Sequence, residues 1–523
     1  MYTTSRVFSS FLTRFVTLRN SQVGGYCVVA GPNVEEQQGE PSRQSDDEDD
    51  VPLRPSLTVS PKELKLYTRS HIPAVLNAYL DGQNVDPLPY MAAASVLPMR
   101  ANNYVIDELI DWSNIPDDPI FQLVFPQPGM LNEPDIEHMM SLIRKGVDRI
   151  TLRNEAEKIR QNLNPHPAQQ KTLNVPKESG EELPGMQHKY RETVLFFPSE
   201  GQYCQSFCTY CFRWAQFTAV GSDQAFQCSE PELLRNYLQK NKCISDVLFT
   251  GGDPMVLTSK QWQKYFDPLI NSPDMEHIST LRIGTKSLAY WPYRFISDPD
   301  SDHLLRLFES VVQSGRHLAI MAHFTHPTEL STPAVQMAIR RLQMTGAVIR
   351  SQAPLVNHVN ADATTWAHMW RAQVRMGIVP YYMFVERDTG AKHYFEVPLD
   401  KALSIYNEAV SNVSGISRTV RGPSMSATPG KVHVVGISEV RGEKVFVLRF
   451  LQARNPDWMK QVFFAKFDPE ASWLNDLKPA FGEEEFFFEK ELDEISAAPT
   501  SSGTLFPYED EMAYNNMVLS PRG

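Results

Sequence analysis

The sequence predicts an α/β fold in which parallel β-strands alternate with α-helices. Six short apolar segments have the length and composition of buried strands, at residues 193–197, 246–252, 281–285, 318–324, 347–355 and 379–385. Helical patterns such as PELLRNYLQKN and HLLRLFESVVQSG lie between them. Strand–helix alternation implies a parallel sheet with right-handed crossovers, because parallel neighbours need a crossover connection. Six such units favour a barrel or partial barrel over an open sheet.

The composition agrees with a folded globular protein. Of its 523 residues, 42% are apolar and 21% are charged. The net charge of −12 argues against general nucleic-acid binding, and no apolar run approaches the roughly 20 residues that cross a bilayer. Cys27, Cys228 and Cys243 show no pairing pattern, which favours a reducing compartment over a disulfide-built secreted domain.

The first 56 residues are expected to lie outside the folded core. Residues 1–34 contain no Asp, Glu or Lys, are rich in Ser, Thr and Arg, and place their apolar residues on one helical face. This pattern is typical of an organelle transit peptide, although an extension without special meaning has the same composition. Residues 35–56 are acidic and polar, as in a disordered linker. The expected location is therefore the mitochondrial matrix or the cytoplasm.

Two further regions flank the strands. Residues 57–190 are expected to be mostly helical, with Ser60 as N-cap and Pro61 in the first turn. The core of alternating strands and helices occupies residues 191–425. Residues 426–523 begin with the strand-like KVHVVGI and KVFVLRF and end in an acidic, aromatic stretch, which predicts a small α+β extension.

Cys204, Cys208 and Cys211 form a C-x3-C-x2-C motif just after the first predicted strand. Such a trio suits a redox pair, a zinc site completed by a histidine such as His188 or His323, or an iron–sulfur cluster. A 4Fe–4S cluster on three cysteines keeps one iron open for a small molecule, and this interpretation is favoured. Aromatic neighbours would shield the cluster from water; they are Tyr203, Phe207, Tyr210 and Phe212.

The motif and its surroundings resemble the radical S-adenosylmethionine superfamily and, within it, the lysine 2,3-aminomutase family. The resemblance is carried by LPGMQHKYRETVLFF, LFTGGDPMVL, RIGTK, HFTHPTEL, QAPLVNHVNAD, PYYMF and TGAKHYFEVPL. Upstream, LPMRANNYVIDELID and DDPIFQLVFP are similar to the helical region of the family. The resemblance runs from about residue 60 to about residue 440. It implies a radical S-adenosylmethionine (β/α)6-type partial barrel.

The resemblance implies two ligands at the cysteine motif. The three cysteines would ligate a 4Fe–4S cluster, and the open iron would chelate S-adenosylmethionine and cleave it to a 5′-deoxyadenosyl radical. The cofactor-binding candidates Thr250, Gly251, Gly252 and Asp253 match the segment that cradles the methionine end. Two glycines after a strand let the backbone approach a ligand closely, although a plain tight turn has the same sequence.

The resemblance also implies pyridoxal phosphate. Lys431, in GPSMSATPGKVHV, matches the lysine that carries this cofactor, although Pro429 and Ser or Thr replace most glycines of the family segment. An ordinary surface lysine is the alternative. The family has an arginine for the phosphate where this chain has Thr193. Arg191 would point to the same side of a strand and is the candidate replacement, with a surface role as the alternative.

The expected substrate is an amino acid. Arg213 matches the family arginine that binds the substrate carboxylate, and its fork geometry suits that task. Two family aspartates hold the distal ammonium of lysine. The first aligns with Glu386 or Arg387 and the second with Arg421 or Ser424. At least one acidic partner is missing, which favours an acidic or neutral substrate side chain.

Together these residues predict a 2,3-aminomutase that uses the cluster, S-adenosylmethionine and pyridoxal phosphate to move an α-amino group to the β-carbon. Two alternatives share the motifs: a radical enzyme on the same scaffold without pyridoxal phosphate, and a non-catalytic iron–sulfur protein. The zinc site of some lysine-acting relatives cannot form from cysteines, because the carboxyl-terminal region has none. Expected partners are an electron donor such as ferredoxin or flavodoxin and further copies of the chain in a homo-oligomer, without nucleic acid or membrane.

Overall fold

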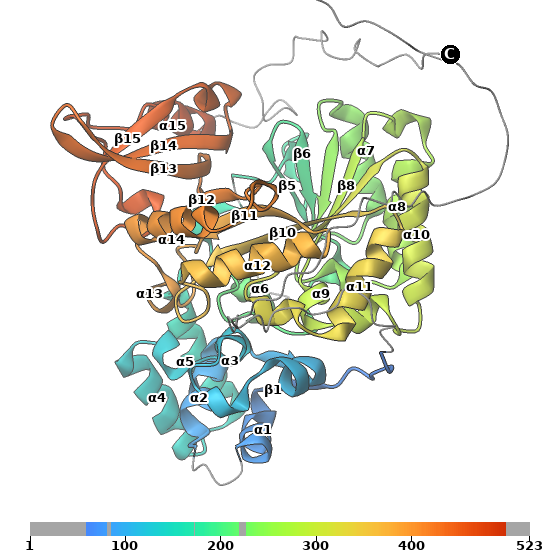
Figure 1. Ribbon diagram of the computed structural model, residues 1–523, viewed down its shortest axis with the longest axis vertical. Helices are drawn as coiled ribbons and strands as arrows, with labels where there is room; N and C mark the ends of the chain where they lie inside the picture. Colours follow the sequence, from blue (N-terminus) through green and yellow to red (C-terminus); the bar gives the residue numbers. More distant parts are fainter. Residues whose placement is uncertain (1–58, 81–84, 172, 219–225, 498–523) are drawn as a thin grey trace, which may run out of the picture. The chain divides into compact units, whose positions relative to one another are not determined.

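A large curved sheet organises the chain (Figure 1). The computed structural model describes residues 59–80, 85–171, 173–218 and 226–497. Within them, one sheet has the strand order β15-β14-β13-β12-β11-β10-β9-β8-β7-β6-β5. Its strands are β5 (Met186–Tyr190), β6 (Thr193–Phe196), β7 (Asp246–Phe249), β8 (Thr280–Thr285), β9 (His317–His323), β10 (Val348–Leu355), β11 (Val379–Val385), β12 (Arg421–Ser426), β13 (Gly430–Val440), β14 (Glu443–Ala453) and β15 (Val462–Lys466).

The centre of this sheet is parallel. Strands β6 to β12 pair in parallel in chain order, and β5 and β13–β15 pair antiparallel at the two ends. The six predicted strands are present as β6 to β11. The α/β class predicted from strand–helix alternation is therefore confirmed.

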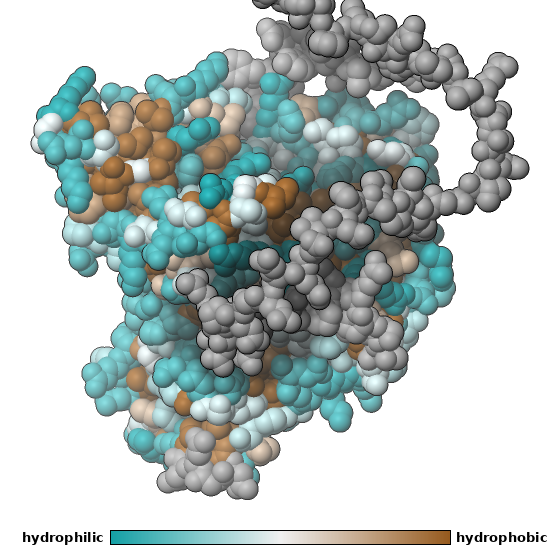
Figure 2. All heavy atoms as spheres, in the orientation of Figure 1, coloured by the Kyte–Doolittle hydropathy of each residue, from teal (hydrophilic) through white to brown (hydrophobic). Residues whose placement is uncertain are grey.

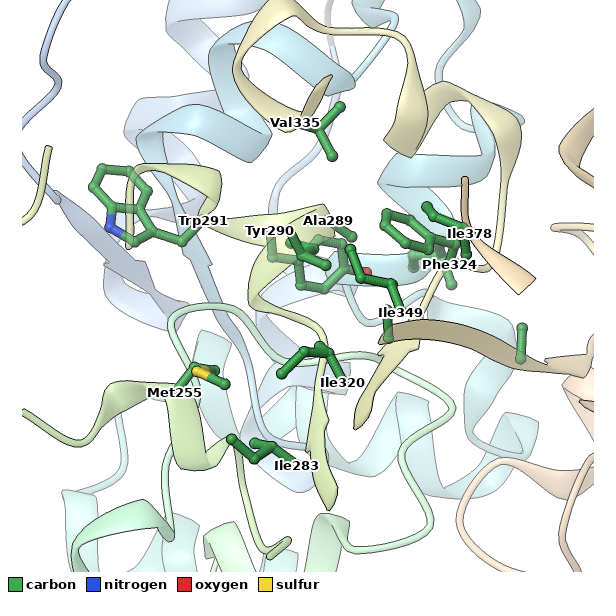
Figure 3. Packing of buried hydrophobic residues seen from close by; sticks show 14 of the residues in the cluster. Met255, Ile283, Ala289, Tyr290, Trp291, Ile320, Phe324, Val335, Ile349 and Ile378 are labelled. Carbon is green, nitrogen blue, oxygen red and sulfur yellow. The ribbon is translucent and has the colours of Figure 1, made fainter. Parts of the chain in front are cut away.

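Helices follow the central strands and cover the outer face of the sheet (Figure 1). The longer ones are α7 (Pro231–Lys240), α8 (Ser259–Ile270), α10 (Ser301–Gln313), α11 (Pro333–Met344), α12 (Ala363–Arg375) and α14 (Leu399–Ser411). Short ones lie in the loops: α6 (Trp214–Thr218), α9 (Ser287–Tyr290) and α13 (Lys392–Phe395). Ile283, Ile320 and Ile349 of neighbouring strands pack in the core that also holds Met255 and Tyr290 (Figure 3).

The segment before the sheet is mostly helical. It contains α1 (Ile72–Tyr79), α2 (Leu88–Val96), α3 (Pro119–Val124), α4 (Glu133–Arg144) and α5 (Arg149–Gln161), with β1 (Leu66–Thr68) paired to β2 (Arg100–Asn102) and the small hairpin of β3 (Lys177–Glu178) and β4 (Glu181–Glu182). The helix start expected at Ser60 and Pro61 is wrong. Residues 66–68 are held by β2, so the helix begins at Ile72 and Pro73 occupies its first turn.

The sheet is curled so that its two ends meet. Lys189 of β5 donates from Nζ to the carbonyl of Ala427, just beyond β12. In a flat sheet these strands would lie roughly 34 Å apart, at about 4.8 Å for each strand spacing. A second bridge joins Arg454, at the end of β14, to Oδ1 of Asn174 at 2.5 Å. The concave face between the bridged ends therefore becomes the wall of a cavity.

The last strands have a core of their own. Strands β13, β14 and β15, with α15 (Glu489–Ala497), bury a cluster that includes Trp458, Phe463 and Phe488. Hydrophobic residues also gather on the surface of this part, at the upper left of Figure 2. Val435 of β13, Val462 of β15 and Phe487 are among the exposed apolar side chains of this part of the chain.

The transit peptide and acidic linker expected at 1–56 lie outside the described residues. The expected boundaries between the other regions can be compared with the elements of the structure. The boundary at 190/191 falls in the turn between β5 and β6, and that at 425/426 falls inside β12. The division into regions stays a prediction. In the described part of the chain, no helix has both the length and the apolar character to cross a membrane.

Candidate active site

A cavity of about 340 Å³ lies on the concave side of the curled sheet. This volume is in the range of small-molecule sites. Its lining brings together most of the predicted site residues from segments more than 200 residues apart in the chain: Cys204, Cys208, Cys211, Arg213, Thr250, Gly251, Gly252, Asp253, Glu386, Arg387 and Lys431. Arg191, Arg421 and Ser424 are not part of it.

The cysteine loop follows β6 and is anchored by the helical region. Phe207 N donates to the carbonyl of Arg100 at 2.8 Å, and Thr209 N donates to that of Leu123 at 2.9 Å. Arg100 donates in turn from Nη1 to the carbonyl of Cys204 at 3.0 Å, and its guanidinium lies 4.8 Å from the centre of the Phe207 ring. The region before the sheet thus fixes the shape of the loop.

The three thiols line the cavity and are shielded from water. Burial raises the pKa of Cys204, Cys208 and Cys211, that of Cys211 to about 12, so the free groups are neutral thiols at pH 7. Cationic iron would reverse this preference, because coordination deprotonates a thiol. Thiols gathered on one short loop, facing a cavity, are the donor set that an iron–sulfur cluster requires.

The geometry does not support a zinc site. In the described ranges, no three His, Cys, Asp or Glu side chains converge as they would around one metal ion. His188 Nδ1 instead bonds the Tyr237 hydroxyl at 2.7 Å, away from the cavity, and His323 Nε2 bonds Gln352 Nε2 at 2.6 Å. A cube-shaped cluster sets its ligands further apart than a single ion does.

Three of the four expected aromatic shields are placed as predicted. Phe207, Tyr210 and Phe212 line the cavity beside the cysteines, whereas Tyr203 does not and is 49% exposed. The residue that sequence reasoning missed is Tyr290, whose hydroxyl accepts from Cys208 Sγ at 3.8 Å. Tyr290 belongs to α9, about 80 residues further along the chain, so local sequence carried no signal for it.

The two glycines after β7 make room for the cysteine loop. A Cβ on Gly252 would lie 2.6 Å from the backbone nitrogen of Tyr203, and one on Gly251 would overlap the side-chain amide of Gln202. Gly251 also has φ of +151°, a conformation that favours glycine. The sequence predicted that the backbone of these glycines approaches a ligand closely. In the structure, the segment that lies close to them is the loop that carries Cys204.

Asp253 joins the ends of β7 and β8. Its carboxylate accepts from Thr285 Oγ1 at 2.7 Å, from Ser287 Oγ at 3.0 Å and from the backbone N–H groups of Lys286 and Met255 at 2.9 and 3.0 Å. Four donors occupy both oxygens. Although Asp253 lines the cavity, its carboxylate is used within the protein.

Lys431 lies on β13 and faces the cavity. Its Nζ donates to Gln452 Oε1 at 3.1 Å and lies 4.2 Å from the centre of the Tyr382 ring. Burial lowers the pKa of Lys431 to about 7, and the charges of Arg282 and Arg421 add to this effect. A lysine that is partly neutral at pH 7 is a nucleophile for carbonyl compounds. Its surroundings differ from those of an ordinary surface lysine.

Arg213 and Arg387 both lie against Phe212. The guanidinium carbon of Arg213 is 5.0 Å from the Phe212 ring centre and 4.3 Å from that of Phe197, and the carbon of Arg387 is 4.8 Å from that of Phe212. Arg213 is only 9% exposed. Burial lowers its pKa to about 10, and the charge of Arg387 acts in the same direction.

Comparisons with known proteins were made for the whole chain. A scan against models of protein families matches none. An Aquifex aeolicus protein named "Putative L-lysine 2,3-aminomutase" is 29% identical over 379 residues, which cover 72% of this chain and 87% of the relative. The L-lysine 2,3-aminomutase of Escherichia coli is 27% identical over 45% of this chain and 63% of its own length.

The chain is therefore similar to proteins named as lysine 2,3-aminomutases, in one case over 72% of its length. The resemblance carried by the motifs is thereby confirmed. The relatives also include one named for another amino acid: the glutamate 2,3-aminomutase of Clostridioides difficile is 24% identical over 41% of this chain and 47% of its own length.

One departure from the family pattern concerns Arg191. Strands β5 and β6 form an antiparallel hairpin, so Arg191 lies in the turn, exposed and outside the cavity lining. Alternation along a strand does not apply to a turn, so this placement does not support Arg191 as an anion ligand. The basic side chains near Lys431 are instead Lys189 of β5 and Arg282 of β8, both of which line the cavity, and burial lowers the pKa of Lys189 well below its usual value.

Arg282 had a sequence signal that was not used. It is a charged residue in the middle of the apolar strand LRIGT, which is unusual for a position between neighbouring strands. Its Nε donates to Oδ1 of Asp246 at 2.8 Å, and Thr193 donates from its hydroxyl to Oδ2 of the same carboxylate at 3.1 Å. Thr193 and Arg282 are therefore neighbours that bond the same carboxylate, that of Asp246.

The other departure concerns the four residues aligned with the lysine-binding aspartates. Arg387 and Glu386 line the cavity. Arg421 is exposed and stacks on Tyr381 and Tyr382, outside the lining, and Ser424 is fully buried. Of these four residues, Arg387 and Glu386 are therefore the two that border the cavity.

Proposed function

We propose that the chain is a radical S-adenosylmethionine aminomutase that moves the α-amino group of an amino acid to its β-carbon. The observation that carries this proposal is that the cysteine trio, Arg213 and the Lys431 amine open into the same cavity. The names of the relatives support it, because lysine and glutamate 2,3-aminomutases are both among them.

The residues present fit the groups that this chemistry needs. Cys204, Cys208 and Cys211 would hold a 4Fe–4S cluster, with S-adenosylmethionine beside Thr250 and Gly251, and Lys431 would hold pyridoxal phosphate. When bound, the cluster and S-adenosylmethionine supply a radical that removes a hydrogen atom, and pyridoxal phosphate carries the migrating nitrogen.

The protein's own side chains would bind and orient the substrate and exclude water from it. Arg213 would take the α-carboxylate of the substrate through a paired, charge-assisted contact. Phe197 and Phe212 lie against its guanidinium and keep water from it. Lys431 offers a partly neutral amine at pH 7, because burial disfavours its ammonium form and lowers its pKa to about 7.

The finer architecture and partners belong to the same proposal. Strands β6 to β11 with their helices would form the (β/α)6-type partial barrel of the superfamily, between a helical region at 57–190 and an α+β extension at 426–523. Reductive cleavage of S-adenosylmethionine needs one electron, which a ferredoxin or flavodoxin would deliver.

The exposed apolar side chains Val435 and Val462 support a homo-oligomer. The location would be the mitochondrial matrix or the cytoplasm.

The test is anaerobic reconstitution with iron, sulfide and pyridoxal phosphate, followed by incubation with S-adenosylmethionine, a reductant and candidate amino acids. Mass spectrometry and chromatography should detect a β-amino acid of unchanged mass, and Lys431→Ala should lack both pyridoxal absorbance and product. Irreversible consumption of S-adenosylmethionine without amino transfer would contradict the aminomutase and point to another radical reaction. A cluster spectrum without cleavage would point to a non-catalytic protein.

A further inference from the structure

The cavity holds two arginines whose hydrogen-bonding groups are incompletely used. Among the described residues, Nη1 of Arg213 and Nε of Arg387 are buried without a hydrogen-bond acceptor. Arg387 does donate from Nη2 to the carbonyl of Ser426 at 2.6 Å and from Nη1 to Gln170 at 3.4 Å. Both acceptors are neutral, so neither guanidinium has its charge balanced by a bonded anion.

No carboxylate of the described residues forms a direct ion pair with these arginines, although the charges of Asp388 and Glu386 act to raise the pKa of Arg387. The acidic residues of the described lining are Asp253 and Glu386. Asp253 already accepts from four donors. Within the described ranges, no carboxylate oxygen lies within 4.0 Å of either guanidinium, and this includes Asp388, the next residue after Arg387.

Glu386 lies toward the cysteine loop. Its charge acts on Tyr210 and Cys211, which belong to that loop, and also on Arg387 beside it in the chain. Burial raises the pKa of Glu386 to about 8, so the group is mainly a neutral acid at pH 7. The cavity therefore presents to a ligand two arginines without an ion-pair partner and a neutral acid, and it offers no unoccupied, ionised carboxylate for a second ammonium group.

Arg213 and Arg387 lie near the same ring, that of Phe212, and a ligand with two anionic groups could pair with both. Because both guanidinium carbons lie within 5.0 Å of the centre of Phe212, they are at most 9.8 Å apart. The carboxyl carbons of a five-carbon dicarboxylate are about 5 Å apart when extended. Such a molecule can meet a guanidinium at each end.

We propose that the substrate is an α-amino dicarboxylic acid, with Arg213 on its α-carboxylate and Arg387 on its side-chain carboxylate. This inference rests on the proposed amino transfer and names its substrate class. Arg387 is the residue that determines specificity.

The chemistry of the shift narrows the class. The C2–N bond breaks, a C3–N bond forms and one hydrogen atom passes from C3 to C2, so nothing is oxidised or reduced overall. On aspartate this shift returns a constitutionally identical molecule. Glutamate is the shortest member that gives a new compound, 3-aminopentanedioate. Its two carboxylates are equivalent, which matches a site with an arginine at each end.

The experiment measures binding without turnover. Protein carrying its cluster and pyridoxal phosphate is mixed with S-adenosylmethionine but no reductant, and affinities for L-glutamate, L-glutamine and L-lysine are measured by calorimetry. Glutamate should bind roughly 10- to 100-fold more tightly than glutamine, its neutral isostere, which is the range of one charge-assisted pair. Lysine should bind more weakly still.

Variants assign the discrimination to Arg387. Arg387→Gln should remove the difference between glutamate and glutamine, and Arg387→Lys should restore part of it. Arg421→Gln is the matched control, because Arg421 also stacks on aromatic rings but lies outside the lining. Tighter binding of lysine than of glutamate, or discrimination that survives Arg387→Gln, would overturn the proposal.

The outcome is separable from that of the proposed function. If glutamate binds through Arg387 but addition of reductant yields no 3-aminopentanedioate, the substrate class stands and the aminomutase fails. If reductant yields β-lysine from lysine, the aminomutase stands and the substrate class fails.

Discussion

The amine of Lys431 lies over the ring of Tyr382 in the lining of the cavity, with Nζ 4.2 Å from the ring centre. The ring and the surrounding strands replace water around the amine without giving it an anion. This explains why burial is the first cause that lowers the pKa of Lys431 to about 7. Reactivity toward carbonyl compounds should follow from this environment.

The first prediction concerns the pH dependence of that reactivity. Because the neutral amine is the nucleophile, the initial rate of pyridoxal phosphate attachment at Lys431 should rise about tenfold between pH 6 and pH 8 and then level off. Borohydride trapping and mass spectrometry of the Lys431 peptide measure it. Labelling that climbs as far as pH 10, in step with exposed lysine peptides of the same digest, would contradict the buried environment.

The second prediction concerns the glycines after β7. Gly252→Ala places a methyl group 2.6 Å from the backbone of Tyr203, so the cysteine loop must move. We expect a loss of about 1–3 kcal/mol in the free energy of unfolding and a lower iron content after reconstitution. Gly436→Ala is the control, because a Cβ there meets nothing within 4 Å. Equal iron content in the two variants would show that the loop does not depend on this contact.

The third prediction compares two basic residues of the β5–β6 hairpin, Lys189 and Arg191. Lys189 lines the cavity, whereas Arg191 lies in the exposed turn after β5. Lys189→Met should lower the affinity for pyridoxal phosphate at least about tenfold, because the phosphate would favour the ammonium form that burial disfavours and that charge-assisted contact would be lost. Arg191→Met should leave the affinity unchanged, as measured by fluorescence titration. The reverse result would restore the turn arginine as the phosphate ligand.

Sequence patterns predicted what depends on local order. The six strands follow from short apolar runs, and the cysteine trio follows from its spacing and its place after β6. Contacts between distant segments could not be predicted from local sequence patterns. Examples are the contact of Tyr290 with Cys208 and the hydrogen bond of Asp253 with Thr285 of β8. Arg191 was misplaced for a physical reason, since two residues that share a side of a strand no longer do so when the chain turns between them.

The last prediction uses the buried carboxyl of Glu386. Burial raises its pKa from 4.5 in the unfolded chain to about 8 in the folded one. Between these values the folded state binds a proton that the unfolded state does not, so stability falls as pH rises from about 4.5 to 8. The cost is absent below pH 4.5 and complete above pH 8.

Glu386→Gln removes this titration and keeps the shape of the protonated acid. The variant should match the parent protein in urea unfolding near pH 4.5 and become progressively more stable than it toward pH 8, by a few kcal/mol at most. Glu439→Gln, at an exposed position on β13, should show no such pH trend. A constant difference between Glu386→Gln and the parent at all pH values would mean that the folded protein keeps Glu386 ionised, and lysine would then regain an acidic partner in the cavity.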